Sequence, residues 1–270
     1  MKKRRADEAL MEQLALETIE LARALIMEGR VMSGDRKILR ASEMIGAEEQ
    51  LRVRGELNSF VSRGAHKLKR ALEVFHLDLN GKICADIGAS TGGFTDVMLR
   101  SGAKKVFSVD VGYNLLDYRL RRDARVVCME RTNARFIQPD SFPEKPQFGA
   151  TDVSFISLKA VLPAVLSAMA PGAQFVALIK PQFEAEKEDV GEKGVVRDPE
   201  VHRRVLEDIL AFVPSTGWHA VGLDYSPIRG PEGNIEFLLM MEDALGCAEA
   251  DVSVERALRG AYDKFMKSSK

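Results

Sequence analysis

Four polar residues occupy positions where the surrounding sequence is apolar, and their types suit proton transfer. They are Lys67, Asp152, Lys180 and Glu236. A lysine whose pKa is lowered by desolvation or by a neighbouring cation can take a proton from a poor nucleophile such as a hydroxyl group. The carboxylates oppose that shift, but they can orient the lysines and the hydroxyl. Singly, each residue is better explained by a salt bridge at a strand end; together, they favour a catalytic set.

The segment from Asp86 to Phe94 is the strongest local signal for a bound cofactor. It joins a buried strand to a helix through a turn of small residues, whose backbone a ligand can approach closely. The expected contacts are Asp86, Gly88, Ala89, Ser90, Thr91, Gly92, Gly93 and Phe94. The glycine spacing differs from the dinucleotide fingerprint, and no P-loop lysine follows it, which argues against a nucleoside triphosphate.

Two acidic residues indicate which cofactor this turn would hold. Asp110 ends the next strand, where a carboxylate can accept both hydroxyl groups of an adenosine ribose. Asp86 can bind an ammonium group, directly or through water. This combination suits S-adenosylmethionine, which carries an amino-acid end. The two carboxylates would not bind a pyrophosphate, which is also negatively charged. The alternative is a tight strand–helix turn without a ligand, which the acid at position 110 makes the weaker interpretation.

From residue 63 onward, apolar strands alternate with amphipathic helices, which is typical of a doubly wound parallel sheet. We expect strands at 82–87, 105–109, 125–129, 148–152, 173–179, 218–224 and 235–241, and helices at 65–75, 93–100, 115–122, 158–169, 199–212 and 252–266. The short connection between the last two strands predicts one antiparallel strand, since a parallel return needs a longer crossover. The charged segment 184–197 is expected to be a solvated loop or a lid.

The predicted fold class is α/β, a Rossmann-like and mostly parallel sheet preceded by a small α+β domain. The predicted bounds are 1–57 for the small domain, 58–62 for a linker and 63–270 for the sheet domain. In the small domain we expect helices at 6–11 and 18–28 and strands at 30–32, 37–39 and 50–53. Because Asp152 and Lys180 end parallel strands, they must share one rim of the sheet.

Composition excludes several classes of protein. The formal net charge of the 270-residue chain is -1, so any nucleic-acid surface must be a local patch. The three cysteines show neither a disulfide framework nor the spacing of a metal site, and we expect no metal. No secretory signal precedes the first helix, and no apolar run reaches the roughly 18–20 residues that a membrane helix needs. We therefore expect a cytoplasmic protein without a membrane partner.

Several motifs together resemble the TlyA family of ribosomal RNA 2′-O-methyltransferases, many of whose members carry the name haemolysin. The similar segments are 62–68, 88–95, 109–113, 130–135, 154–158, 180–184 and 233–236, and the likeness extends over essentially the whole chain. The resemblance implies an FtsJ-like, S-adenosylmethionine-dependent methyltransferase domain. It implies a catalytic tetrad at Lys67, Asp152, Lys180 and Glu236, with Lys180 as the base. It also adds Val111, Asn133 and Asp152 to the cofactor contacts.

The resemblance further implies that the small domain binds RNA and is of the ribosomal protein S-four type. Basic residues expected to contact phosphate, or to lie beside it, are Arg4, Arg5, Arg36, Lys37, Arg40, Arg63, His66, Lys69 and Arg70. The sequence departs from the family at 13–18, where a cation expected to touch phosphate is missing, and at Phe60, where a tryptophan is usual. Residues 1–62 hold eleven basic and eleven acidic side chains, so this domain is not net basic.

The implied substrate is a cytidine ribose in ribosomal subunits, and the residues indicate no oligomeric state. Two other functions stay open at this point. A membrane-acting haemolysin would fit the name of many relatives, but the chain lacks an evidently lytic amphipathic helix. A non-catalytic RNA-binding assembly factor would keep the fold and the cofactor without transferring a methyl group.

Overall fold

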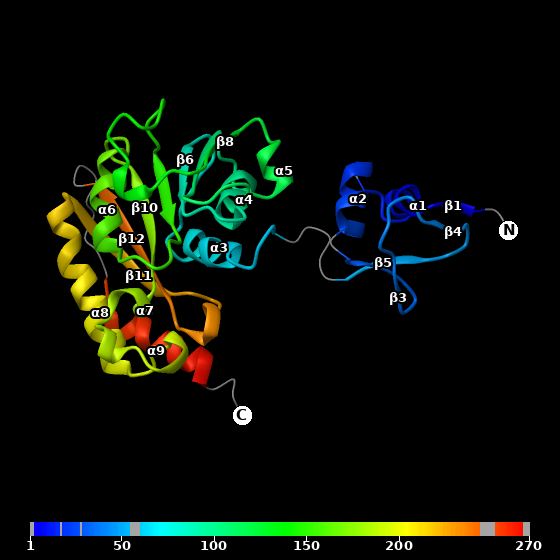
Figure 1. The fold of residues 1–270 in the computed structure, drawn as a ribbon. Helices are drawn as coiled ribbons and strands as arrows, with labels where there is room; N and C mark the ends of the chain where they lie inside the picture. Colours follow the sequence, from blue (N-terminus) through cyan, green and yellow to red (C-terminus); the bar gives the residue numbers. More distant parts are fainter. Residues whose placement is uncertain (1–2, 17, 28, 55–59, 244–251, 267–270) are drawn as a thin grey trace. The chain divides into compact units, whose positions relative to one another are not determined.

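The computed structural model describes residues 3–16, 18–27, 29–54, 60–243 and 252–266. The chain divides into two compact units, Met1–Ser59 and Phe60–Lys270 (Figure 1). Of the expected linker 58–62, residues 58 and 59 lie outside the described residues, and 60–62 belong to the second unit. Cys247 also lies outside the described residues.

The first unit is a small α+β structure with its own apolar core. Helices α1 (Ala6–Gln13) and α2 (Ile19–Met27) accompany the strands β1 (Lys3–Arg5), β2 (Val31–Ser33), β3 (Arg36–Lys37), β4 (Met44–Gly46) and β5 (Leu51–Val53). The strands pair as β1–β4 and as β3–β2–β5. Leu10, Leu25 and Ile45 are among the residues that fill the core. Both helices were predicted, whereas β1 and β4 were not, because three-residue strands offer too little alternation to detect.

The second unit contains the predicted sheet. Its strands run in the order β11–β12–β10–β9–β6–β7–β8. Their bounds are β6 (Ile83–Ile87), β7 (Lys105–Val109), β8 (Val126–Met129), β9 (Phe148–Thr151), β10 (Gln174–Ile179), β11 (Trp218–Tyr225) and β12 (Phe237–Asp243). Strand β12 pairs antiparallel with both of its neighbours, and the four other pairings are parallel. The predicted fold class, with its single antiparallel strand, is confirmed.

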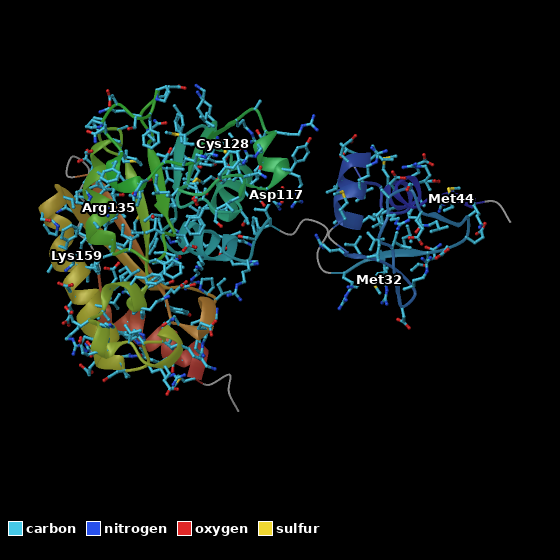
Figure 2. All side chains as sticks on the ribbon, in the orientation of Figure 1. Met32, Met44, Asp117, Cys128, Arg135 and Lys159 are labelled. Carbon is cyan, nitrogen blue, oxygen red and sulfur yellow. The ribbon has the colours of Figure 1, made fainter. Side chains whose placement is uncertain are left out.

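Helices cover both faces of this sheet (Figure 1). They are α3 (Ala65–Val74), α4 (Gly93–Arg100), α5 (Tyr118–Arg121), α6 (Leu158–Ser167), α7 (Pro181–Glu184), α8 (Pro199–Phe212) and α9 (Val254–Met266). Apolar residues of α6, α8 and α9 form one core with the sheet, and those of α3, α4 and α5 form the other. Figure 2 shows the side chains of the described residues. Two buried faces explain why the strands read as continuous apolar runs.

The direction of β12 matters for the polar residue beside it. We expected Glu236 to interrupt a strand at 235–241, but β12 begins at Phe237, so Glu236 immediately precedes the strand. An antiparallel strand begins at the rim where its parallel neighbours end. Glu236 therefore lies at the same rim as Asp152, which follows β9, and Lys180, which follows β10.

Candidate active site

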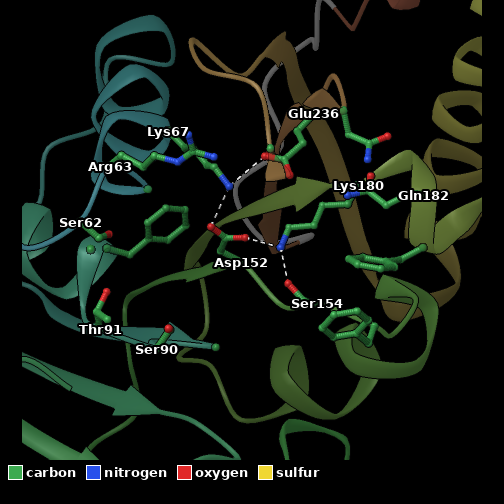
Figure 3. Close-up of a pocket in the computed structure, with 18 of the residues that line it drawn as sticks. Ser62, Arg63, Lys67, Ser90, Thr91, Asp152, Ser154, Lys180, Gln182 and Glu236 are labelled. Carbon is green, nitrogen blue, oxygen red and sulfur yellow. Dashed lines mark hydrogen bonds and ion pairs between the residues drawn. The ribbon is translucent and has the colours of Figure 1, made fainter. Parts of the chain in front are cut away.

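The structure brings the four predicted catalytic side chains into one connected cluster (Figure 3). Lys67 Nζ lies 3.0 Å from Asp152 Oδ2 and 2.8 Å from Glu236 Oε2. Lys180 Nζ lies 2.6 Å from Asp152 Oδ1 and donates a hydrogen bond of 2.8 Å to Ser154 Oγ. Asp152 thus bridges the two lysines with its two oxygens. Lys67 reaches this rim from α3, which packs over the sheet near α4.

Burial makes the cluster electrostatically strong. Lys67 and Lys180 are each only 6% exposed, and Glu236 is completely buried. Burial by itself lowers the pKa of Lys67, but the charges of Asp152 and Glu236 outweigh it and raise that pKa above its ordinary value. Burial also raises the pKa of Glu236, against the opposing charge of Lys67. Lys67 is therefore held as a cation.

The glycine turn approaches this cluster closely. Gly88 has a φ of +84°, and a Cβ there would lie 3.2 Å from the carbonyl oxygen of Asp152. Gly93 begins α4, and a Cβ there would lie 2.3 Å from Ser62 Oγ and 3.0 Å from the nitrogen of Ala65. Glycine is thus required at 93 so that the segment before α3 can pack onto the first turn of α4.

Asp86 lies beneath this turn, in β6, and is completely buried. Its Oδ2 accepts hydrogen bonds from the nitrogen and the hydroxyl of Thr95, at 2.8 and 2.7 Å. Its Oδ1 has no partner among the described residues, although Asp86 lines a cavity. Burial raises the pKa of Asp86 to about 7. A buried acceptor without a partner beside a cavity is suited to a cationic ligand group such as the ammonium of S-adenosylmethionine.

Two adjoining cavities run along the rim. The larger, of about 620 Å³, contains the lysine–carboxylate cluster and Asp86. The smaller, of about 450 Å³, is lined by Asp110, Val111 and Asn133 together with apolar side chains such as Leu115 and Ile156. Gly88, Ser90 and Asp152 line both. An extended ligand with an apolar base at one end and an amino acid at the other fits this pair of cavities.

Asp110 has its carboxylate held toward the glycine turn. Its Oδ2 accepts a hydrogen bond of 2.8 Å from the nitrogen of Ser90, and its Oδ1 accepts one of 2.7 Å from the nitrogen of Gly112. Each oxygen keeps a second lone pair for a ribose hydroxyl. If S-adenosylmethionine binds here, Asp110 would hold its ribose and Asp86 its ammonium.

One predicted cofactor contact does not line either cavity. Gly92, with a φ of +94°, caps α4, and a Cβ there would meet the side chains of Leu116 and Leu120. Its small size therefore serves packing away from the cavity. The other predicted contacts do line a cavity: Asp86, Gly88, Ala89, Ser90, Thr91, Gly93, Phe94, Asp110, Val111, Asn133 and Asp152.

The large cavity also contains residues that the sequence did not single out. Phe155, which is 91% exposed and has a φ of +63°, lies with its ring centroid 5.1 Å from that of Phe183. Ser154 bonds Lys180, and Lys193 and Asn234 line the wall. Phe155 could have been noticed, because it lies in segment 154–158, which resembles a family motif, and closely follows a predicted strand that ends at the rim.

The predicted RNA contacts are mostly paired with carboxylates. In the first unit, Arg4 pairs with Glu12, Arg5 with Asp7, and Arg36 with Glu43 and Glu49. Lys37 and Arg40 are exposed and have no side-chain partner among the described residues. In the second unit, the side chains fall in different places: Arg63 lines the large cavity, His66 packs edge-on against Phe60, Lys69 lies near Glu73, and Arg70 pairs with Asp224.

The described residues hold no group of His, Cys, Asp and Glu side chains arranged to bind a metal ion. Within the same residues, no helix is both long and apolar enough to cross a membrane.

The fold and the site define a class of enzyme. Residues 60–242 match the model of the FtsJ-like methyltransferases, so the chain belongs to that family of S-adenosylmethionine-dependent methyltransferases. Within it, the chain is a member of the TlyA family of ribosomal RNA 2′-O-methyltransferases, as its relatives show.

Three relatives cover most of the chain. YqxC of Bacillus subtilis, named as a candidate rRNA methyltransferase, is 48% identical over 88% of this chain and 85% of its own length. The 16S/23S rRNA (cytidine-2′-O)-methyltransferase TlyA of Mycobacterium tuberculosis is 45% identical over 74% of this chain and 76% of its own. The structure of a candidate hemolysin from Streptococcus thermophilus superimposes with a TM-score of 0.73 and 42% identity, covering 99% of this chain and 98% of that one.

Proposed function

We propose that this chain transfers a methyl group from S-adenosylmethionine to the 2′-hydroxyl of a cytidine in ribosomal RNA. The observation that carries the proposal is the cluster of Lys67, Asp152, Lys180 and Glu236 at the wall of the larger cavity, beside Asp86. A ribose hydroxyl is a poor nucleophile that must lose its proton as it attacks. The names of the relatives support rRNA and cytidine as the target.

We infer different tasks for the two lysines from the contacts that each one makes. Lys67 has two carboxylates within 3.0 Å and stays charged, so it can hold and orient the substrate hydroxyl. Lys180 shares its one carboxylate with Lys67, and its other partner is the neutral Ser154 hydroxyl. Lys180 thus has fewer carboxylate contacts than Lys67. In its neutral form, Lys180 would accept the hydroxyl proton and later release it to solvent.

The bound cofactor would supply a methyl group on a sulfonium, which a deprotonated hydroxyl can attack without further activation. The remaining task of the chain is to bring that hydroxyl to the methyl carbon in line. Phe155 and Phe183 lie side by side at this cavity, and the exposed Phe155 ring offers a face for an unstacked base. A nucleotide extruded from folded RNA would then place its ribose near Lys180.

The first unit would provide affinity for the folded RNA. We propose that it is an S-four-type RNA-binding domain in which Lys37 and Arg40 contact phosphate, because both are exposed and unpaired among the described residues. Arg4, Arg5 and Arg36 would have to exchange their carboxylate partners for phosphate. A ribosomal substrate would place the enzyme in the cytoplasm.

The test uses labelled S-adenosylmethionine and ribosomal subunits that lack the modification, followed by mapping of the methyl group. Lys180→Ala should lower the rate by at least about 100-fold, because it removes the proton acceptor. Lys159→Ala, a change on the surface of α6, should not alter the rate (Figure 2). Methyl on a base instead of a ribose, or equal rates for the parent protein and Lys180→Ala, would refute the mechanism.

The two competing functions give different results in the same preparation. A non-catalytic assembly factor would bind S-adenosylhomocysteine but leave ribosomal subunits unlabelled. A membrane-acting protein would release dye from liposomes, and Lys180→Ala would not change that release.

A further inference from the structure

Two left-handed turns face the large cavity. Lys193 and Gly194 have φ angles of 60° and 70°, and Glu232 and Gly233 have φ angles of 58° and 97°. Lys193, Gly194 and Glu232 line the cavity. A left-handed conformation costs free energy at a residue with a side chain, so it persists only where the surrounding structure holds it.

One buried residue, Asn234, is bonded to both turns. Its Nδ2 donates a hydrogen bond of 2.8 Å to the carbonyl of Gly194, and its Oδ1 accepts one of 3.0 Å from the nitrogen of Val196. Its own carbonyl accepts one of 2.9 Å from the nitrogen of Gly230, which closes the second turn. Asn234 is 2% exposed, so these bonds are shielded from competing water. Asn234 therefore links the charged segment to the turn that precedes Glu236.

The segment that Asn234 anchors carries Lys193, a cation without a partner among the described residues. Lys193 lines the cavity, and its amine has neither an ion pair nor a hydrogen bond within the described part of the chain. Two other cations of the same region are paired, Lys180 with Asp152 and Arg204 with Asp189. Arg63, which also lines the cavity, has no ion pair or side-chain hydrogen bond among the described residues either. A lysine kept at the wall of a substrate cavity by a strained turn, with no carboxylate of its own, is suited to an anionic group on the substrate.

We propose that Asn234 is a positioning residue that holds Lys193 against a backbone phosphate of the RNA, next to the ribose that is methylated. The proposal rests on the RNA substrate argued above. A phosphate is one nucleotide linkage from any RNA 2′-hydroxyl, so a cation at the wall of the cavity that holds Lys180 is placed to meet one. The other anion that could reach Lys193 is the carboxylate of the cofactor, and the experiment separates the two.

The experiment measures methylation of undermethylated ribosomal subunits by the full chain at several salt concentrations. Lys193→Gln should raise the KM for subunits about tenfold and change kcat less than twofold, since one charge-assisted contact is lost. The slope of log kcat/KM against log salt should become shallower by about 0.7 to 0.9, the value for one phosphate contact. Lys145→Gln, which removes an exposed lysine just before β9 at the opposite rim of the sheet, should change neither quantity.

A double-mutant cycle tests the part played by Asn234. Asn234→Ala should also raise the KM for subunits, and adding Lys193→Gln to it should raise KM less than a further twofold, because the lysine is no longer presented. If Asn234→Ala does not fold, Asn234→Asp, which keeps the Oδ1 acceptor and loses the Nδ2 donor, takes its place in the cycle. Independent, multiplying effects of the two changes would overturn the positioning role.

The affinity for S-adenosylhomocysteine separates the remaining outcomes. Unchanged affinity in Lys193→Gln supports the phosphate contact, whereas a tenfold loss would assign Lys193 to the cofactor carboxylate and overturn it. An unchanged KM and salt slope in Lys193→Gln, with ribose methylation by the parent protein intact, would overturn this inference alone. Absence of ribose methylation by the parent protein would instead overturn the proposed function.

Discussion

Asp86 is fully buried, and one of its carboxylate oxygens has no hydrogen-bond partner among the described residues. Burial raises its pKa to about 7, so near neutral pH the carboxyl group is partly protonated when no cation is beside it. A ligand ammonium would favour the charged form and lower that pKa. Binding of such a ligand must therefore release a proton below pH 7, and ligand affinity must depend on pH.

We predict that the Kd for S-adenosylhomocysteine rises about 15-fold between pH 7.0 and pH 5.5. This follows because a group with a pKa of about 7 must be deprotonated before it pairs with the ammonium. Isothermal titration calorimetry at several pH values measures this change. Asp86→Asn, which keeps the shape and loses the charge, should bind more weakly at pH 7 and show little dependence on pH. The same slope in this variant would assign the titration to another group.

Lys67 and Lys180 have the same side chain but different neighbours. Both residues are 6% exposed. Lys67 contacts the carboxylates of Asp152 and Glu236, whereas Lys180 contacts only the other oxygen of Asp152 and the Ser154 hydroxyl. Coulombic attraction to these two carboxylates in a poorly solvated site raises the pKa of Lys67. Residue type alone could not separate them, because the number of carboxylates near each amine depends on the fold.

At the scale of elements, α3 and α4 must approach each other closely to bring Lys67 to the rim. Gly93 permits this approach, because its missing side chain leaves room for Ser62 and for the backbone before α3. The nitrogen of Val61 also donates a hydrogen bond of 3.0 Å to Asp96 in α4. The glycine turn and α3, which carries Lys67, are therefore packed as one structure.

We predict that Gly93→Ala destabilises the second unit by about 1–3 kcal/mol, the usual cost of overpacking, and weakens cofactor binding. The added methyl group would displace Ser62 and shift the turn that lines the cavity. Urea unfolding and the Kd for S-adenosylhomocysteine measure the two effects. Gly46→Ala is a suitable control, since its Cβ would find no atom nearer than 3.9 Å. Equal stability of Gly93→Ala and the parent protein would show that the segment moves without cost.

At the scale of the whole molecule, each unit has a separate core, and one buried histidine connects three elements of the larger unit. His202 of α8 is 1% exposed, hydrogen-bonds the Tyr262 hydroxyl of α9 and packs against Phe237 of β12. Its Nε2 has no partner among the described residues. Burial lowers its pKa to about 4, so the folded protein keeps this imidazole neutral.

We predict that His202 makes the parent protein less stable relative to a His202→Leu variant as the pH falls from about 6.5 to about 4, while Asp86, whose pKa is raised, opposes this loss in both proteins. In this window the unfolded chain binds a proton at His202 and the folded chain does not, so the stability present above pH 6.5 is lost, by about 2 kcal/mol at pH 5. Fluorescence of Trp218, the single tryptophan, reports unfolding of this unit.

The matched variants for this prediction are His202→Leu and His76→Asn. His202→Leu should gain stability relative to the parent protein between pH 6.5 and pH 5. His76→Asn, a change at an exposed residue whose positive φ asparagine tolerates, should show the same pH dependence as the parent protein. A difference in stability between the parent protein and His202→Leu that is the same at pH 6.5 and pH 5 would contradict the prediction.

The sequence by itself determined the class of fold, the longer elements and most of the groups at the site. Helices α4 and α8 and strand β7 have the bounds that periodicity predicted, because caps, glycine and buried runs are local properties. Short elements such as β1 and β4 were missed, since they form only through pairing with each other. Polar residues at the ends of apolar strands indicated the rim, because parallel strands all end there.

Which of those groups contact one another at the site depended on the tertiary structure. It set β12 antiparallel to β10, so that Glu236, just before the strand, lies at the rim of Asp152 and Lys180. It also placed two carboxylates against Lys67 and directed Gly92 away from the cavity toward Leu116 and Leu120. It also joined Gly194, the neighbour of Lys193, to Asn234, which is distant in the sequence. Such contacts depend on which strands and loops become neighbours in space. They also gain strength from burial, because water that would compete for the same polar groups is excluded.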